Sequence, residues 1–366
     1  MSRLPMRVPA VRSNLLRQIL IAVGVMVVAA IVLESTGPFR NSQLSSMAYY
    51  AIAAIGLTLL TGLNGQISLG HGALMAVGAY TSALLLRVEE PWPFPLVALA
   101  AVVATTVVGF VVGLAAARFS GPYLAGATLA LAVALPGIAL YFSDSLGGEG
   151  GLTIPVPRAP MWFNDLIMTL SGNFGSGTKY VAYIGWAAFA VTLFFLLNLT
   201  RSHVGRRWRA VRDNDVAAEL AGINLGRTRV QAFVVSAACA GLAGAVMALV
   251  VRLAAPSAFT IVLSLGLLTA IVIGGLGSMT GAVLGSAILV FLPGAVTNFA
   301  TARGLSSTQA AQVAPFIYGI VLVLVILLAP SGLAGSLSAA YRRIRYGRPG
   351  PPSSRPRPAP SKEISS

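Results

Sequence analysis

A series of long apolar stretches, almost free of charged residues, constrains this chain more than any other feature. A helix needs about 20 apolar residues to cross the roughly 30 Å hydrocarbon core of a bilayer, and a charge at mid-bilayer costs about 2.5–3.5 kcal/mol. Only 10% of the residues are charged, against about 25% in soluble domains. The sequence therefore predicts an all-α, polytopic membrane protein with about ten transmembrane helices. The predicted spans are residues 18–33, 44–62, 69–86, 94–117, 123–142, 180–199, 230–251, 260–276, 280–300 and 313–329.

The first apolar stretch follows four arginines, a pattern that secretory signal peptides also have. The stretch, residues 18–33, is long for a signal peptide, and no clear small-residue cleavage site comes directly after it. We therefore expect a retained first span, with a cleaved signal peptide as the alternative.

The distribution of basic residues predicts which side of the membrane each loop faces. With a cytoplasmic N-terminus and ten spans, 19 of the 25 Lys and Arg residues fall on the cytoplasmic side, as the positive-inside rule favours. The net charge of +15 is then explained by topology and anionic lipid rather than by nucleic acid. The predicted parts are a basic cytoplasmic N-terminus (1–17), a membrane domain (18–335) with a cytoplasmic loop (201–229) and an external loop (143–179), and a basic, disordered cytoplasmic tail (336–366).

The cytoplasmic loop is a long polar interruption that is rich in both charge signs. Within it, residues 213–222 predict a helix of about two turns, in which Asp213 or Asn214 accepts the free amides of the first turn. Gly222 suits a left-handed cap at the other end. Such a short helix is marginal alone in water, so the membrane domain or a partner must hold it; a polar connector on the bilayer surface is the alternative. Its apolar face consists of Val216 and Leu220, with Ala217 and Ala221 alongside.

Two glycine-rich stretches interrupt the apolar pattern, at residues 62–73 and 274–285. Membranes tolerate such broken or re-entrant helices only where protein buries them or they line a cavity. A pair of them points to a central pathway, where free N–H groups near residues 68–72 and 277–281 could bind a carboxylate. Close helix packing through small residues is the alternative. The candidate pathway residues are Ser68, Gly70, His71, Gly72, Gly277 and Ser278.

The predicted external loop, residues 143–179, combines a glycine-rich turn with an apolar segment after Pro160. The apolar segment predicts an interfacial amphipathic helix, with Trp162 and Phe163 at the level of the lipid headgroups. An external partner would also bind at this surface.

The sequence carries no pattern of catalytic or metal-binding residues. It has no phosphate-binding loop, kinase motif set or nucleophile elbow, so we expect a chain that is not an enzyme and does not hydrolyse ATP. The single cysteine, Cys239, and the two histidines predict no metal site. For His71 a structural role is favoured over a proton relay or a substrate ligand, and His203 is expected to be solvated.

The cytoplasmic loop resembles the coupling loop of ABC-importer permeases, whose signature is Glu-Ala-Ala, three residues and Gly. Here Ala217, Ala218 and Gly222 match it, Val216 replaces the Glu, and the Leu-Pro that often ends the signature is absent. The fuller string at residues 205–224 resembles permeases of the branched-chain amino acid (leucine/isoleucine/valine) importer family. Residues 65–80, 147–153, 274–285 and 330–335 are similar to the same family, so the resemblance covers about residues 44–335.

This resemblance implies a permease subunit in the inner membrane, with both termini cytoplasmic, that carries branched-chain amino acids or related small amides. It implies that a separate cytoplasmic ATPase binds the ATP, so that this chain holds no cofactor. It also implies a second permease subunit and a periplasmic substrate-binding protein as partners. The loop helix would lie in a groove of the ATPase as a rigid lever. The residues assigned to ATPase coupling are Asp213, Asn214, Val216, Ala217, Ala218, Glu219, Leu220 and Gly222.

Two other functions remain open from the sequence. A sugar or nucleoside permease of the same broad superfamily would differ in what its partner receptor binds. An ion-coupled secondary transporter usually needs intramembrane acidic residues, which are few here. Uptake that persists without any ATPase would favour the ion-coupled transporter.

Overall fold

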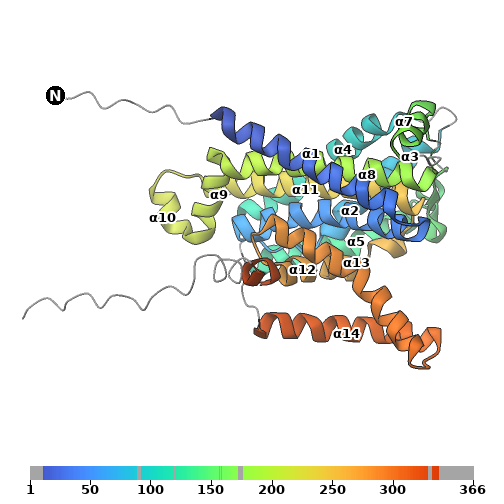
Figure 1. The fold of residues 1–366 in the computed structure, drawn as a ribbon. Coiled ribbons are helices and arrows are strands. Elements are labelled where there is room, and N and C mark those ends of the chain that lie inside the picture. The colour runs from blue at the N-terminus through green and yellow to red at the C-terminus, as the bar shows by residue number, and fades with distance from the viewer. Residues whose placement is uncertain are drawn as a thin grey trace, which may run out of the picture.

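The computed structural model describes residues 11–88, 92–118, 121–155, 157, 159–171, 176–328 and 332–337. These residues form a bundle of long helices that run roughly side by side (Figure 1). Most of the predicted basic N-terminus (1–17) and nearly all of the predicted tail (336–366) lie outside the described residues.

Every predicted apolar stretch coincides with a helix. Seven helices in the described part of the chain are long and apolar enough to cross a membrane, and two further apolar helices, α3 and α12, have 16 and 14 residues. The polytopic all-α fold is therefore confirmed, whereas ten complete spans stay a prediction. The ten helices that coincide with the predicted stretches are α1 (Val11–Ser35), α2 (Pro38–Thr58), α3 (His71–Leu86), α4 (Phe94–Arg118), α5 (Pro122–Tyr141), α8 (Gly177–Arg201), α11 (Leu225–Val251), α12 (Ile261–Gly274), α13 (Met279–Ala302) and α14 (Ser307–Leu328).

Short elements occupy the connections between these helices. A two-stranded antiparallel sheet, which the sequence did not predict, pairs Leu152 with Ala254 and Thr153 with Leu253. The short elements are the π-helical turn η1 (Leu59–Leu63), α6 (Ser143–Leu146), η2 (Gly148–Gly150), β1 (Leu152–Thr153), α7 (Met161–Ser171), α9 (His203–Asp213), α10 (Asp215–Leu220), β2 (Leu253–Ala254) and η3 (Pro256–Phe259).

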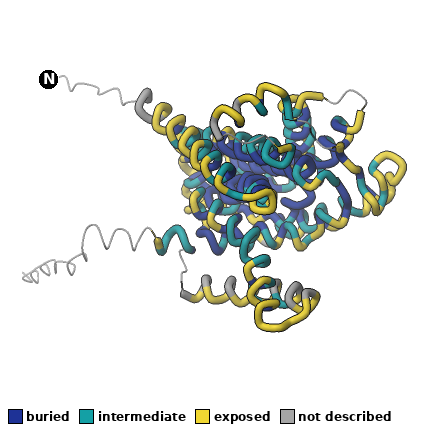
Figure 2. Tube along the Cα trace, turned by 45° about the vertical axis from the view of Figure 1, so that its right-hand side comes forward, coloured by how far each residue is buried: buried dark blue, intermediate teal, exposed yellow. Residues whose placement is uncertain are grey.

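Helix α11 forms the centre of the bundle, where it packs against α4, α3 and α2. Buried residues gather in this central region, and the outward faces are exposed (Figure 2). Small residues allow the close approach: a Cβ at Gly78 on α3 would overlap the backbone of Gly241 on α11. Small residues are typical of helix interfaces in membranes, since lipid supplies no hydrophobic force between helices and close contact must replace it.

The amphipathic helix predicted in the external loop is α7, at the end of the bundle opposite α10 (Figure 1). Trp162 is exposed, as an interfacial anchor requires, but Phe163 is buried. The ring of Phe163 lies 5.0 Å from that of Tyr180 and 5.5 Å from that of Tyr183 on α8. The prediction that Phe163 reaches the headgroups is therefore wrong, because this ring holds α7 against α8 instead.

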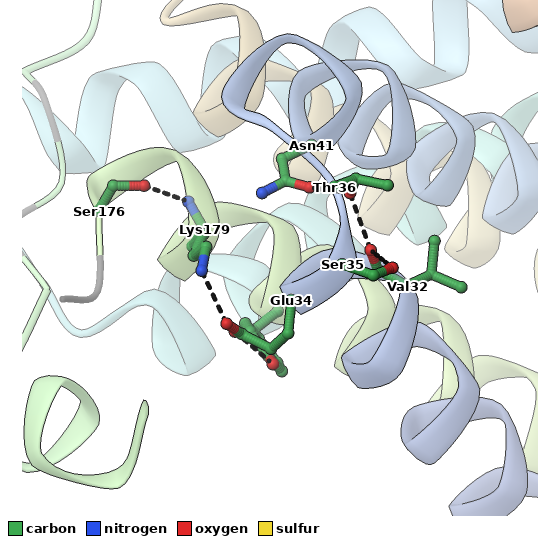
Figure 3. A network of polar contacts seen from close by, with 8 residues as sticks. Val32, Glu34, Ser35, Thr36, Asn41, Ser176 and Lys179 are labelled. Atoms are coloured by element: carbon green, nitrogen blue, oxygen red, sulfur yellow. Dashed lines mark hydrogen bonds and ion pairs between the residues drawn. The ribbon is translucent and has the colours of Figure 1, made fainter. Parts of the chain in front are cut away.

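The first helix, α1, lies along α8, and charged groups join the two at one end. Lys179 Nζ lies 2.7 Å from Glu34 Oε2, and the Tyr183 hydroxyl donates to Glu34 Oε1 at 3.1 Å (Figure 3). The Lys179 and Glu34 side chains are only 13% and 19% exposed. Removing one partner of such a shielded pair costs more than removing one partner of a surface ion pair.

We expect Lys179→Met to lower the stability of the solubilised protein by about 1–3 kcal/mol, because it removes the Lys179 cation from beside a shielded carboxylate. Glu34→Gln alone should also destabilise, whereas the double variant should lose less than the sum of the two. Thermal denaturation of the four proteins of this double-mutant cycle measures the coupling. Strictly additive losses would show that the ion pair does not attach α1.

Candidate functional site

The loop predicted to be cytoplasmic (201–229) contains α9, a helix that the sequence analysis did not predict. Its buried face includes Trp208, which is fully buried, and Val211. Together with Val204 these residues follow the i, i+4, i+7 spacing of an apolar helix face, which was the signal available in the sequence. Ser202 caps the helix by accepting from the amide of Val204 at 3.1 Å. The large buried indole therefore anchors α9 on the bundle.

Helix α10 follows directly and is shorter than predicted, with six residues. Its N-cap is Asn214, whose Oδ1 accepts from the amide of Ala217 at 3.0 Å. Asp213, the other predicted cap, ends α9 and pairs with Arg212 at 2.6 Å. The predicted single helix over residues 213–222 is thus wrong at its start, because Asn214 adopts an extended backbone that separates α9 from α10.

The C-terminus of α10 has the predicted glycine cap. Gly222 has a φ of +81°, which confirms the left-handed conformation. Its amide donates to the Glu219 carbonyl at 2.9 Å, and the amide of Ile223 donates to the Ala218 carbonyl at 3.0 Å. These two bonds make a Schellman motif, which satisfies the last carbonyls of a helix. Both ends of α10 are therefore capped, so that a very short helix keeps a defined shape.

Two apolar side chains of α10 are highly exposed. Val216 is 63% and Leu220 is 86% exposed, whereas Ala218 is only 4% exposed. The helix projects together with α9 beyond one end of the bundle (Figure 1). The start of α1 lies at the same end of the bundle. The predicted apolar face therefore points away from the protein, on a short helix that α9 attaches to the core.

The two glycine-rich stretches are breaks between helices, as predicted. The first lies between η1 and α3, and the second separates α12 from α13. At Gly62 and Gly277 the two breaks touch backbone to backbone, since a Cβ on Gly62 would overlap the amide nitrogen of Gly277. We call this contact the glycine junction. Gly277 has a φ of +82°, a conformation that favours glycine.

Three amides of the first break, those of Leu69, Gly70 and Gly72, have protein partners. Leu69 donates to Thr128 Oγ1 at 3.0 Å, and Gly72 donates to Ser264 Oγ at 2.9 Å. Gly70 N lies 3.4 Å from Ser68 Oγ. In this conformation three of the five amides at residues 68–72, which were expected to bind a carboxylate, therefore have side-chain partners. In the second break Gly281 likewise donates to Ser278 Oγ, at 3.1 Å.

His71 opens α3 and is fully buried. Its Nε2 lies 3.2 Å from Ser236 Oγ on α11, and Ser236 donates to the carbonyl oxygen of Gly56 on α2 at 2.7 Å. The imidazole thus joins three helices, which supports the structural role. Gly70 is equally confined, because a Cβ there would lie 2.5 Å from the Thr128 carbonyl oxygen. A Gly70→Val variant would therefore lose uptake through packing alone.

A polar cavity of about 410 Å³ lies between the first break and the loop that carries α9 and α10. It brings together charged residues that the sequence analysis did not assign to a site, among them Arg212, Asp215 and Arg229. Of the predicted coupling residues, Asp213 and Asn214 line it, whereas the candidate pathway residues do not. The lining is Asn64, Gly65, Gln66, Gly121, Val211, Arg212, Asp213, Asn214, Asp215 and Arg229.

Among the described residues, no three His, Cys, Asp or Glu side chains come close enough to hold a metal ion. The site consists of an exposed helix, α10, that is attached to the bundle through α9, and of two helix breaks that touch at the glycine junction. Such an arrangement can transmit movement of α10 into the membrane helices.

Comparison with known proteins identifies what kind of chain has this arrangement. Residues 41–328 match the family described as "Branched-chain amino acid transport system / permease component". The chain is 30% identical over 298 residues to the high-affinity branched-chain amino acid transport system permease protein LivM of Escherichia coli (strain K12), covering 77% of this chain and 69% of that protein. It is 26% identical over 295 residues to LivH of the same strain, covering 78% and 91%. BraD of Pseudomonas aeruginosa, another such permease protein, is 27% identical over 300 residues, covering 78% and 91%. No solved structure matches the chain.

Proposed function

This chain belongs to the family of permease components of branched-chain amino acid transport systems, and we propose that it carries branched-chain amino acids or related small amides across the inner membrane in an ATP-driven importer. It is a multi-pass membrane protein. The names of its relatives favour this substrate class over sugars or nucleosides and over ion-coupled transport.

The observation that carries the proposal is the exposed, doubly capped helix α10. Exposed Val216 and Leu220 on a helix of six residues are the kind of surface that a partner protein covers. The chain itself has no phosphate-binding loop, so the energy comes from a cytoplasmic ATPase that seats α10 in a groove. ATPase closure then moves α10 and rocks the membrane helices, provided that the ATPase contacts differ between the two states.

Three partners complete the proposed importer. The ATPase subunits bind α10, a second permease subunit completes the pathway, and a periplasmic binding protein delivers the substrate. The presence of both LivM and LivH among the relatives supports two different permease subunits in one system. The exposed external helix α7 lies at the end of the bundle that would face the binding protein (Figure 1).

The proposed orientation places α10 and both termini in the cytoplasm. Six arginines lie on α9 and on the first two turns of α11, at Arg206, Arg207, Arg209, Arg212, Arg227 and Arg229. The positive-inside rule favours the cytoplasm for this end of the bundle. The start of α1 at the same end agrees with a cytoplasmic N-terminus.

The test is Ala217→Arg. Ala217 is exposed on α10, so the substitution leaves the permease folded but places a long charged side chain in the contact surface. We expect ATPase association to weaken about tenfold or more, equivalent to at least 1.4 kcal/mol. The measurement is the amount of ATPase that co-purifies with tagged permease.

Ala302→Arg is the matched control, because Ala302 is an exposed alanine at the far end of α13. It should retain the ATPase as the wild type does. If Ala217→Arg retains it equally well, α10 is not the ATPase contact and the proposed coupling role is wrong.

A further inference from the structure

One side chain connects the cytoplasmic loop directly to the glycine junction. Arg212, in the last turn of α9, donates from Nη1 to the carbonyl oxygen of Gly62 at 2.6 Å. Its Nε and Nη2 donate to Asp213 Oδ1 at 2.9 and 2.6 Å. A guanidinium is a planar, rigid fork, and hydrogen bonds from a charged donor are about twice as strong as neutral ones. A single rigid group therefore holds the α9–α10 connection against the end of η1.

The Gly62 carbonyl is available because the helix ends there. In a continuing α-helix it would accept from the amide of Gln66, but that amide donates instead to the Leu60 carbonyl at 3.1 Å, two residues further back. The last carbonyls of a helix lack partners within the helix and carry its partial negative charge. The Arg212 cation supplies a hydrogen-bond donor to the Gly62 carbonyl and also opposes this partial negative charge, so its bond to Gly62 is electrostatically favourable.

Gly62 is also the residue through which the two breaks meet. Its backbone lies against that of Gly277, with no room for even one methyl group between them. A shift of the Gly62 carbonyl therefore has to move Gly277 or lose the contact. A continuous chain of contacts therefore leads from α10 through Arg212 to Gly62 and from there to Gly277 in the second break.

A second, weaker link joins the loop to the first break through Arg229 and Gln66. Gln66 donates from Nε2 to the Arg229 carbonyl at 3.1 Å, and Arg229 lies 3.5 Å from Asp215 on α10. Asp215 is 54% exposed, and exposed ion pairs contribute little. The loop thus contacts the first break at two points, Gly62 and Gln66, and Arg212 makes the charged contact.

We infer that Arg212 is a positioning residue that transmits the movement of α10 to the glycine junction, and so couples ATPase closure to the opening of the pathway. The inference rests on the proposed function and adds the residue that carries the coupling. Without Arg212 the ATPase still binds α10 and still closes. In that protein the Gly62 carbonyl no longer moves together with α10, so ATP is hydrolysed without transport.

The experiment uses the complete importer, with both permeases, the ATPase and the binding protein, reconstituted in lipid vesicles. For Arg212→Gln we expect ATPase association and ATP hydrolysis to change by less than about twofold. Uptake per ATP hydrolysed should fall about tenfold or more, which is the scale of one lost charge-assisted hydrogen bond. Arg212→Lys keeps one charged donor and should restore part of the ratio, which a merely structural role would not produce.

Arg207→Gln is the matched control, since it removes the same charge from the exposed side of α9. It should leave uptake per ATP unchanged. An unchanged ratio in Arg212→Gln overturns the inference, and so does loss of ATPase association, because Arg212 would then only shape α10. The proposed function fails separately, if Ala217→Arg keeps the ATPase or if wild-type vesicles show no ATP-dependent uptake.

Discussion

Gly244→Val is expected to abolish the folded permease. Gly244 lies on α11 where it crosses α3, and a Cβ there would overlap the carbonyl oxygen of Met75. The obstacle is the backbone of α3 rather than a side chain, so no rotamer change relieves it. The amide of Ala79 lies only 3.0 Å from the same position. We expect a loss at or beyond the upper end of the roughly 1–3 kcal/mol typical of overpacking.

The measurement is the yield of monodisperse protein after solubilisation, together with uptake in cells. Gly126→Val is the matched control, because Gly126 also lies within a helix, α5, but a Cβ there meets nothing within 4 Å. Both substitutions replace a helical glycine by a β-branched residue, so that differences in helix propensity cancel. Equal yield and uptake for the two variants would show that the α3–α11 crossing tolerates separation.

Gly62→Ala is expected to stop transport while leaving a folded, assembled protein. The added methyl would overlap the amide nitrogen of Gly277 and lie 2.5 Å from its Cα, so the two breaks must separate. The overlap lies where helices end rather than within a long interface, and irregular segments move at lower cost than packed helices. Since overpacking costs about 1–3 kcal/mol and each 1.4 kcal/mol is a factor of ten, we expect about a tenfold or larger loss of uptake.

Uptake of radiolabelled leucine, normalised to the amount of assembled complex, measures this effect. Gly294→Ala is the control, because its Cβ would lie 3.6 Å from the Gln43 amide, an ordinary contact. Gly62→Ala with wild-type uptake would mean that the glycine junction is not part of the moving pathway. Failure of the variant to assemble would contradict the expectation too, because it would make the junction a folding contact.

Local patterns allowed much of the fold to be predicted. Apolar stretches locate helices because each span must satisfy its own backbone in lipid, and the predicted cap at Gly222 depends only on its neighbours in the chain. Predictions failed where a distant segment decides. Phe163 was expected at the lipid surface, but Tyr180 and Tyr183 bury it. The amides of Leu69 and Gly72 were expected to be free, but Thr128 and Ser264 accept from them.

The sequence by itself determined that this chain is a helical membrane protein, where its apolar helices and breaks lie, and which loop carries the capped helix. These features follow from hydrophobicity, glycine and capping residues over a few turns of chain. Only the tertiary structure decided that the two breaks meet at Gly62 and Gly277, and that Arg212 joins the loop to that meeting point. A contact between segments so far apart depends on how the whole bundle packs, and no local pattern encodes it.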